Sequence, residues 1–381
     1  MTTISTASEK ARAHLVRSMT DTGALTSPGW TDAFRGVPRE AFVPSFQVRH
    51  GGQVDTVTAQ DPSFYTAVYQ DTSLITRWDS GGTAVSSSSE PSLMARMLGA
   101  FTVTDTDRVL EVGTGTGYNT ALLCHRLGDD QVFSIDIDPE LTTTARQSLA
   151  TVGYAPHLVT GDGTRGVGAR APYGGILATC GVHRIPAEWV RQVRPGGIIV
   201  TNIGTGIVAL RAAGDGTATG GFLPDPAAFM IARPTPEQVA HRAASYTALV
   251  INGTGRASRI DLSDVVQDSR GFYRDLMEGG ALEVALTQYD VLSMHLTAGD
   301  TNVYGLVHPD TGSWARITPT GEFTTDVAVG GPRDLWAERA TLTAQWIAAG
   351  RPGPGAYTLT VEPDGAHTLR RDEPATASWR L

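Results

Sequence analysis

The pattern of apolar and polar positions divides the chain into three parts. From residue 81 to residue 232, short apolar runs of strand type alternate with patterns of helical period, which predicts a parallel sheet covered on both faces. Residues 1–80 begin with two helical patterns and continue as a loop-rich cap with weak strands near Phe64–Val68 and Leu74–Arg77. After residue 233 the pattern changes to short strands joined by turn residues, so residues 233–381 are predicted to form a separate α+β domain.

The segment from Arg108 to Asp136 carries the clearest signal for a ligand. An aliphatic run at Val109–Val112 predicts a buried strand, glycines follow it, and a helical pattern leads to a second strand that ends at Asp136. This order predicts a pocket in which a nucleotide-like ligand lies against glycine backbone and its ribose hydroxyls meet a carboxylate. Asp138 suits the cap of the next helix better than Asp136, which leaves Asp136 for the ribose. A tight turn without a ligand is the alternative.

The details of this segment favour one cofactor. The glycine spacing is G-x-G-x-G rather than the dinucleotide G-x-G-x-x-G, and Glu111 just before the loop would repel a pyrophosphate. S-adenosylmethionine, which carries positive charge and no phosphate, therefore fits better than NAD. Asp162, between two glycines after the third strand, fits an adenine contact, although a plain Asp-Gly turn is the alternative. The residues expected to bind the cofactor are Glu111, Gly113, Thr114, Gly115, Gly117, Asp136, Asp162 and Gly163.

A run of serines is the most distinctive polar segment. Ser86, Ser87, Ser88 and Ser89 precede a helix that is predicted to begin near Pro91. Hydroxyls and amides at a helix start can hold a carboxylate by neutral hydrogen bonds, so the four serines are predicted to bind the substrate in the catalytic site. A flexible linker and a simple helix N-cap at Ser89 are the alternatives.

Composition narrows the class of partners. The net charge of −9 does not favour nucleic acid, and no apolar run approaches the ~18 residues that a membrane span needs. The N-terminal residues have no apolar signal core, and the two cysteines form no disulfide framework, so we expect a cytoplasmic protein. No His/Cys cluster of zinc type occurs in the sequence, and no metal is expected; His125 and His183 receive no role.

Several short motifs together resemble those of protein-L-isoaspartate O-methyltransferases, over roughly residues 12–232. The matching segments are Val37–Pro44, Tyr69–Asp71, Ser87–Pro91, Val109–Gly115, Gly161–Thr164, Ala171–Tyr173 and Pro195–Gly197. The resemblance implies an α/β fold of the Rossmann-like class I S-adenosylmethionine-dependent methyltransferases, here with a C-terminal α+β extension, and it implies S-adenosylhomocysteine as the cofactor product.

The chain also departs from the family pattern. Ser87-Ser88 replace the family's Thr-Ile, Gly174 replaces an acid, and Gly181–Arg184 replace small apolar residues. Residues 234–381 are expected to have no counterpart in a repair enzyme. The whole chain resembles more closely the branch found with ribosomally made, modified peptides, beside ATP-grasp ligases of graspetide pathways, lanthipeptide synthetases or lasso-peptide enzymes. The segments that look like this branch are Ser86–Ser89 before a proline, His125–Asp130, Ala178–Cys180 and Val361–Gly365.

This resemblance implies a substrate and a reaction. The enzyme would methylate an Asp side chain of a ribosomally synthesised precursor peptide, already cyclised by a partner enzyme, and the ester would close to a succinimide (aspartimide) that can hydrolyse to isoaspartate. Residues 233–381 would help to recognise the peptide, so deletion of residues 234–381 would stop peptide modification and preserve cofactor binding. An isoaspartyl repair enzyme and a non-catalytic peptide-binding protein on the same fold are the alternatives.

Overall fold

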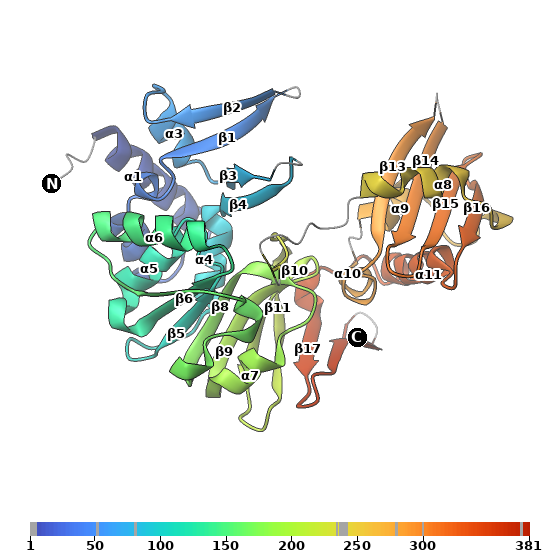
Figure 1. Ribbon diagram of the computed structural model, residues 1–381. Helices are drawn as coiled ribbons and strands as arrows, with labels where there is room; N and C mark the ends of the chain where they lie inside the picture. The colour runs from blue at the N-terminus through green and yellow to red at the C-terminus, as the bar shows by residue number, and fades with distance from the viewer. Residues whose placement is uncertain are drawn as a thin grey trace.

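The computed structural model describes residues 6–50, 53–79, 82–233, 235, 243–278, 281–298, 301–373 and 376–381. Its centre is a large mixed sheet with the strand order β19-β18-β17-β11-β10-β9-β8-β5-β6-β7 (Figure 1). The strands from β9 to β7 are parallel: β5 (Val109–Val112), β6 (Val132–Asp136), β7 (His157–Thr160), β8 (Tyr173–Val182) and β9 (Val193–Ile203). The parallel half begins with β5, and β6 and β7 are added on one side of it. The chain then returns and places β8 on the other side of β5. The topological switch point, where ligands bind in such sheets, therefore lies between β5 and β8.

Apolar clusters cover both faces of this parallel half. Val109 and Leu177 contribute to one cluster, and Leu110 and Ile176 contribute to the other. Every residue of β5 and β6 is buried, as expected for strands between two layers. The helices between the strands are α4 (Pro91–Ala100), α5 (Tyr118–Leu127), α6 (Pro139–Thr151) and α7 (Ala187–Gln192). The structure thus confirms the predicted sheet and the strand-to-Asp136 unit.

The antiparallel half of the large sheet corrects the predicted boundary at residue 233. It consists of β10 (Gly206–Ala212), β11 (Ala218–Pro226), β17 (Tyr357–Val361), β18 (His367–Arg371) and β19 (Ala377–Arg380). Strand β17 pairs with β11, so the last strands of the chain extend this sheet instead of belonging to the C-terminal domain. Tyr357, Leu359 and Val361 are buried there. Their period-two pattern predicts a half-buried strand but does not name the partner strand.

The N-terminal part corrects a second prediction. The stretch described as loop-rich folds into an antiparallel sheet of order β2-β1-β3-β4, with β1 (Ser45–His50), β2 (Gln53–Thr58), β3 (Leu74–Trp78) and β4 (Ala84–Ser88). The predicted weak strand at Phe64–Val68 is a short helix, α3, because Phe64 and Val68 lie four residues apart and both face the core. Helices α1 (Thr6–Asp21) and α2 (Pro28–Gly36) agree with the two helical patterns.

Residues 243–353, which we call the C-terminal lobe, surround a second antiparallel sheet of order β12-β16-β15-β14-β13. Helices α9 and α11 share an apolar cluster with one face of this sheet, and α8 shares another with Trp314 and Val307. The elements are α8 (Thr247–Asn252), β12 (Arg256–Asp261), α9 (Ser269–Glu278), α10 (Leu282–Thr287), β13 (Leu292–Ala298), β14 (Thr301–His308), β15 (Ser313–Pro319), β16 (Thr324–Gly330) and α11 (Leu335–Ala348). Short 3₁₀ turns occur at Arg39–Ala41, Asp129–Gln131, Gly163–Arg165, Gly168–Arg170, Ala243–Tyr246 and Pro354–Ala356.

A buried ion pair joins the C-terminal lobe to the large sheet. Arg371 of β18 donates to Glu283 of α10 at 3.1 Å, and the Tyr357 hydroxyl donates to the other Glu283 oxygen at 2.6 Å. Both charged side chains are almost fully buried, so each charge depends on its partner. None of the described helices has the length and apolarity needed to cross a bilayer.

We expect two deletions to differ in stability because β17–β19 belong to the large sheet. A chain that ends at Arg233 loses the burial of Tyr357, Leu359 and Val361, which contribute about 1.5–3 kcal/mol each, against a typical total stability of about 5–15 kcal/mol. It should aggregate or lose its cooperative unfolding transition. Replacement of residues 243–353 by a Gly-Ser linker of about ten residues, combined with Arg371→Met so that this charge is not left without Glu283, retains these strands and should retain the transition. Thermal unfolding followed by circular dichroism measures both; equal stability of the two deletions would contradict the assignment.

Candidate active site

The glycine loop after β5 has a backbone that only glycine adopts easily. Gly113, Gly115 and Gly117 have φ values of 98°, 52° and 87°. A Cβ on Gly113 would lie 2.8 Å from the Thr179 hydroxyl, which donates to the Gly113 carbonyl at 2.6 Å. Helix α5 starts directly after Gly117. The loop therefore brings its backbone close to neighbouring residues at the switch point of the sheet, with little room for side chains at these glycines.

Asp136 ends β6 beside this loop. Its Oδ2 accepts from the Gly115 amide at 2.8 Å, and its Oδ1 accepts from the Asp138 amide at 3.0 Å. Burial raises the pKa of Asp136, and the two amides oppose that shift. Asp138 caps α6, as predicted, by accepting from the amides of Glu140 and Leu141. Asp136 thus holds the glycine loop in place at the predicted ribose position.

Asp162 and Gly163 follow β7 at the same edge of the sheet. Asp162 Oδ1 accepts from the Thr164 amide at 2.9 Å and from its hydroxyl at 2.6 Å, so the Asp-Gly turn considered as an alternative is present. Oδ2 lies 3.7 Å from Nε of Arg165, and the Asp162 side chain is partly exposed. A Cβ on Gly163 would lie 2.5 Å from the Val112 side chain, so glycine is required for this close approach to β5.

Glu111 lies deeper than the sequence suggests. Its side chain is fully buried, and its carboxylate accepts from Asn119 at 2.7 Å, from Ser134 at 2.6 Å and from the Thr120 hydroxyl. It therefore ties β5 to α5 and β6 beneath the loop. Burial raises its pKa to about 7, although these hydrogen bonds favour the charged form. Thr114 joins the same network, because its hydroxyl lies 2.6 Å from the Ser134 hydroxyl.

The predicted serines divide into two pairs. Ser86 and Ser88 face the interior, where Ser86 accepts from the Thr76 hydroxyl at 3.0 Å. Ser87 and Ser89 are partly exposed. The Ser87 carbonyl lies 3.8 Å from the position of a Cβ on Gly115, which places β4 next to the glycine loop. Ser87 is therefore the serine that the structure brings closest to the predicted cofactor, and the segment is a strand end rather than a flexible linker.

The structure reveals an organising residue that sequence reasoning did not single out. The buried Arg39 guanidinium donates to the Ser88 hydroxyl at 3.2 Å and to backbone carbonyls. The carbonyls belong to Val68, Gln70, Thr72, Ser88 and Ser89, at 3.0–3.2 Å. Burial lowers its pKa to about 10, so it stays charged at neutral pH. The available signal was a charged residue between the apolar positions of the Val37–Pro44 motif.

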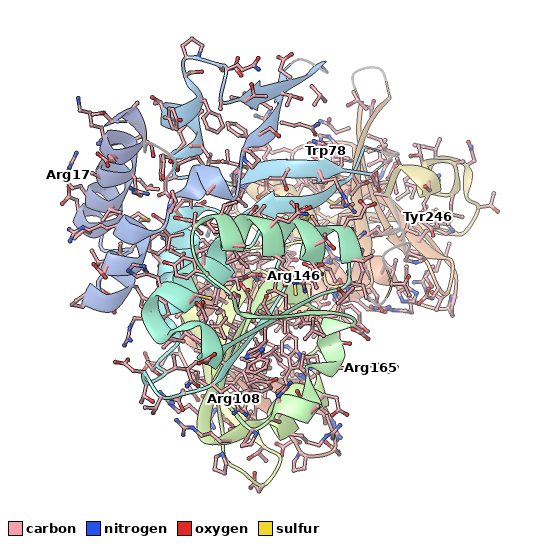
Figure 2. All side chains as sticks on the ribbon, turned by 60° about the vertical axis from the view of Figure 1, so that its left-hand side comes forward. Arg17, Trp78, Arg108, Arg146, Arg165 and Tyr246 are labelled. Atoms are coloured by element: carbon pink, nitrogen blue, oxygen red, sulfur yellow. The ribbon has the colours of Figure 1, made fainter. Side chains whose placement is uncertain are left out.

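Two further contacts fix the strand that carries the serines. Asp71 accepts from the Ser92 amide at 2.8 Å and from its hydroxyl at 2.5 Å, so Asp71, rather than Ser89, satisfies the first turn of α4. Arg77 of β3 forms ion pairs with Asp138 and, at 3.3 Å, with Glu140 at the start of α6. Figure 2 shows the N-terminal sheet, with Trp78 labelled, above the α6 helix that carries Arg146. The N-terminal sheet is thus attached at the predicted cofactor site.

The residues at this site suit S-adenosylmethionine in their chemistry. The glycine loop leaves its backbone free of side chains for a close ligand, Asp136 lies at the predicted ribose position, and Asp162 has a partly exposed side chain after the next strand. Within the described ranges, no group of three His, Cys, Asp or Glu side chains is placed to hold a metal ion.

Comparisons with known proteins agree with the family resemblance that the motifs carry. A family model described as protein-L-isoaspartate(D-aspartate) O-methyltransferase (PCMT) matches residues 9–213. The protein-L-isoaspartate O-methyltransferase of Ignicoccus hospitalis is 32% identical over 194 residues, which are 50% of this chain and 81% of that protein. The Aeropyrum pernix enzyme of the same name is 31% identical over 199 residues, 51% of this chain and 68% of its own length.

The fold and the site define a class I S-adenosylmethionine-dependent methyltransferase. The chain belongs to the protein-L-isoaspartate O-methyltransferase family, whose members are protein carboxyl O-methyltransferases. S-adenosylmethionine is accordingly its cofactor.

One solved structure corrects the expectation about residues 234–381. A protein-L-isoaspartate O-methyltransferase with 21% identity and a TM-score of 0.53 covers 94% of this chain and 98% of its own length. Such coverage leaves room for only a small unmatched part, so most of the C-terminal region has a structural counterpart in that chain. The expectation that this region has none was wrong, and the region by itself does not set this chain apart from all proteins of that name.

The site can perform methyl transfer without a proton-transfer residue. The bound cofactor supplies an electrophilic methyl group on a sulfonium. A side-chain carboxyl with a pKa near ~4 is already an anion at neutral pH, so no general base is required. The work of the protein is to align the two reactants and exclude water. We expect the glycine loop, Asp136 and the Arg39-supported β4 to do this work.

Glu111 should make stability depend on pH. Because the folded pKa of about 7 exceeds the ordinary value of 4.5, the folded protein keeps a proton that the unfolded chain releases. The free energy of unfolding should therefore fall as the pH rises from about 5 to about 7, by up to about 1.4 kcal/mol per pH unit from this group. Glu111→Gln should flatten this slope in urea unfolding, and the exposed control Glu9→Gln should not. A wild-type slope in Glu111→Gln would contradict the assignment.

Arg39 should act as a positioning residue. Lysine keeps the charge but cannot reach all the carbonyls around the guanidinium, so Arg39→Lys should lower stability by about 3 kcal/mol or more. The substitution should raise KM for a peptide acceptor more than it raises the cofactor Kd. The reason is that β4, which carries Ser86–Ser88 and which we call the serine strand, depends on Arg39. Calorimetric titration and steady-state kinetics test this, with the exposed Arg35→Lys as control. Equal weakening of cofactor and acceptor would argue for a general loss of folding.

Proposed function

We propose that this enzyme methylates the side-chain carboxylate of an aspartate in a ribosomally synthesised, modified peptide. The methyl ester then undergoes attack by the backbone nitrogen of the next residue, which loses its proton and expels methanol to form a five-membered succinimide. Water can reopen this ring to isoaspartate. The peptide is expected to carry rings made by a partner enzyme before methylation.

The observation that carries the proposal is the position of the serine strand. Ser87 lies beside Gly115 of the glycine loop, where the resembling family has the threonine of a Thr-Ile pair. The neighbouring Ser88 hydroxyl accepts from Arg39, so serine at this second position has a defined partner inside the protein. Serine for threonine at position 87 keeps a hydroxyl but removes a methyl group beside the glycine loop, while the buried Ser88 changes the interior support of the same strand. Both changes suit an acceptor different from the family's usual one.

A second candidate is supported by the comparisons. The relatives are named protein-L-isoaspartate O-methyltransferases, and a solved structure of the same name also covers most of the C-terminal region. In that case the acceptor is the isoaspartyl carboxylate, and the same ring closure returns normal aspartate. The two candidates share the cofactor and the ester chemistry and differ only in the acceptor.

Acceptor peptides of one sequence should separate the candidates. A gene neighbouring this one that encodes a short Asp-containing precursor, beside an ATP-grasp or lanthionine enzyme, would supply the sequence. The cyclised Asp peptide should gain about 14 Da on methylation and then lie about 18 Da below its starting mass as the succinimide. The measurement is mass spectrometry over time with S-adenosylmethionine.

Three matched peptides serve as controls. The cyclised peptide with Asp replaced by Asn should stay unmodified, and the linear Asp peptide should react more slowly. Modification of the isoaspartyl version alone would refute the proposal and establish the repair function. No methyl transfer to any of the peptides would instead favour a non-catalytic peptide-binding role.

A further inference from the structure

The C-terminal lobe contains a cavity of about 440 Å³, between α9 and the strands β13 and β14. It lies apart from the elements that build the glycine-loop site. Helix α9 and the two strands provide its lining, which consists of Arg270, Tyr273, Arg274, Met277, Glu278, Ser293, Met294, His295 and Tyr304. A cavity of this size can accept one or two side chains of a bound peptide.

Stacked rings form one wall of the cavity. The Tyr273 and Tyr304 ring centroids lie 5.5 Å apart with an interplanar angle of 18°, and the His295 ring lies 4.8 Å from Tyr304 on the next strand. Met277 adds a flexible apolar surface at the same place. Flat rings together with a methionine are suited to contact an aromatic or large aliphatic side chain.

Guanidinium groups lie at the rim. Arg270 and Arg274 are one helical turn apart on α9 and both are exposed. Among the residues that the structure describes, Arg270 forms no ion pair, and Arg274 has only a long contact of 3.5 Å with Asp275. Arg351 forms an ion pair with Asp275 at 2.9 Å, so the negative charge of Asp275 is balanced by this arginine. With Glu278 as the acid at this rim, positive charge predominates, which favours a carboxylate ligand.

Strand β13 offers a backbone edge next to the cavity. One side of β13 pairs with β14 from Leu292↔Val307 to Ala298↔Thr301. In the described part of the chain no strand pairs with its other side. An extended peptide can add to such an edge by main-chain hydrogen bonds, and its alternate side chains then point to one face.

We propose that the C-terminal lobe binds an extended acidic segment of the peptide substrate along β13. An apolar or aromatic side chain of that segment enters the cavity against Tyr304, and an acidic side chain two residues away pairs with Arg270 or Arg274. This inference rests on the proposed function only in taking the acceptor to be a peptide. Binding here raises the local concentration of the peptide at the methyl-transfer site without a contact to the reacting carboxylate.

A synthetic probe tests the inference on the full-length protein. The fluorescein-labelled peptide Ser-Glu-Ser-Phe-Ser-Glu-Ser places Glu, Phe and Glu on one face of a strand, and fluorescence anisotropy measures its Kd. It should bind about tenfold or more tightly than the peptides with Gln for Glu or Ser for Phe. Backbone N-methylation at alternate residues should also weaken binding, because it blocks hydrogen bonds to β13.

Variants locate the site. Arg270→Gln/Arg274→Gln and, separately, Tyr304→Ser should reduce binding of the acidic peptide to the level of the matching control peptide. The matched double variant Arg256→Gln/Arg259→Gln removes the same charge from β12, at the other edge of the sheet, and should bind like wild type. Unfolding temperatures establish that each variant is folded. Equal binding of the acidic and Gln peptides, or an equal loss in both double variants, would overturn the inference.

Three further outcomes would assign the cavity to a second copy of the chain or would refute only one of the two proposals. Dimerisation of the chain that disappears in Arg270→Gln/Arg274→Gln, measured by light scattering without peptide, would give the cavity to a second copy and overturn the inference. A protein that binds the acidic probe but methylates no Asp peptide would refute the proposed function alone. A protein that methylates Asp peptides without preferring the acidic probe would refute this inference alone.

Discussion

The buried guanidinium of Arg39 is the interaction on which the acceptor side of the site depends. It gathers carbonyl groups from the turn after α3 and from the end of the serine strand, segments far apart in sequence. Burying a charged group is costly unless hydrogen bonds replace the lost water, and here the backbone itself supplies them. Two interactions therefore place Ser87 beside the glycine loop: the hydrogen bonds of Arg39 to these carbonyls and the pairing of β4 with β3.

The C-terminal lobe is inserted between two paired strands of the large sheet. The chain leaves the large sheet after β11, forms the lobe, and returns to pair β17 with β11. An inserted lobe is held at both ends, and the Glu283–Arg371 pair adds a contact between them that neither side can keep without the other. A recognition site in the lobe can therefore stay at a defined distance from the methyl-transfer site, whereas a lobe attached by one linker would move more freely.

The parts of the fold that could be predicted are those whose structure is determined by residues close together in the sequence. The unit from Val109 to Asp136 is recognisable because its strands, glycines and capping Asp138 each act within a few residues. The partner of β17 and the environment of Arg39 depend on contacts between distant segments, which no periodicity encodes. Glu111 shows the same limit within the site: its position before the loop was evident, but its direction into the core depends on Ser134 and Asn119. The N-terminal sheet was missed because β2 is a polar strand, with weak alternation.

The charge of Arg39 also bears on the reaction. An anionic carboxylate and a cationic sulfonium become neutral products, so charge decreases on the way to the transition state. A fixed cation at the acceptor would stabilise the free carboxylate more than the transition state and would slow the transfer. Arg39 lies behind β4, and its donors are directed to the carbonyls of Ser88, Ser89 and the α3 turn. The acceptor side is thereby left with neutral hydroxyls, which can orient a carboxylate while giving up little stabilisation as its charge disappears.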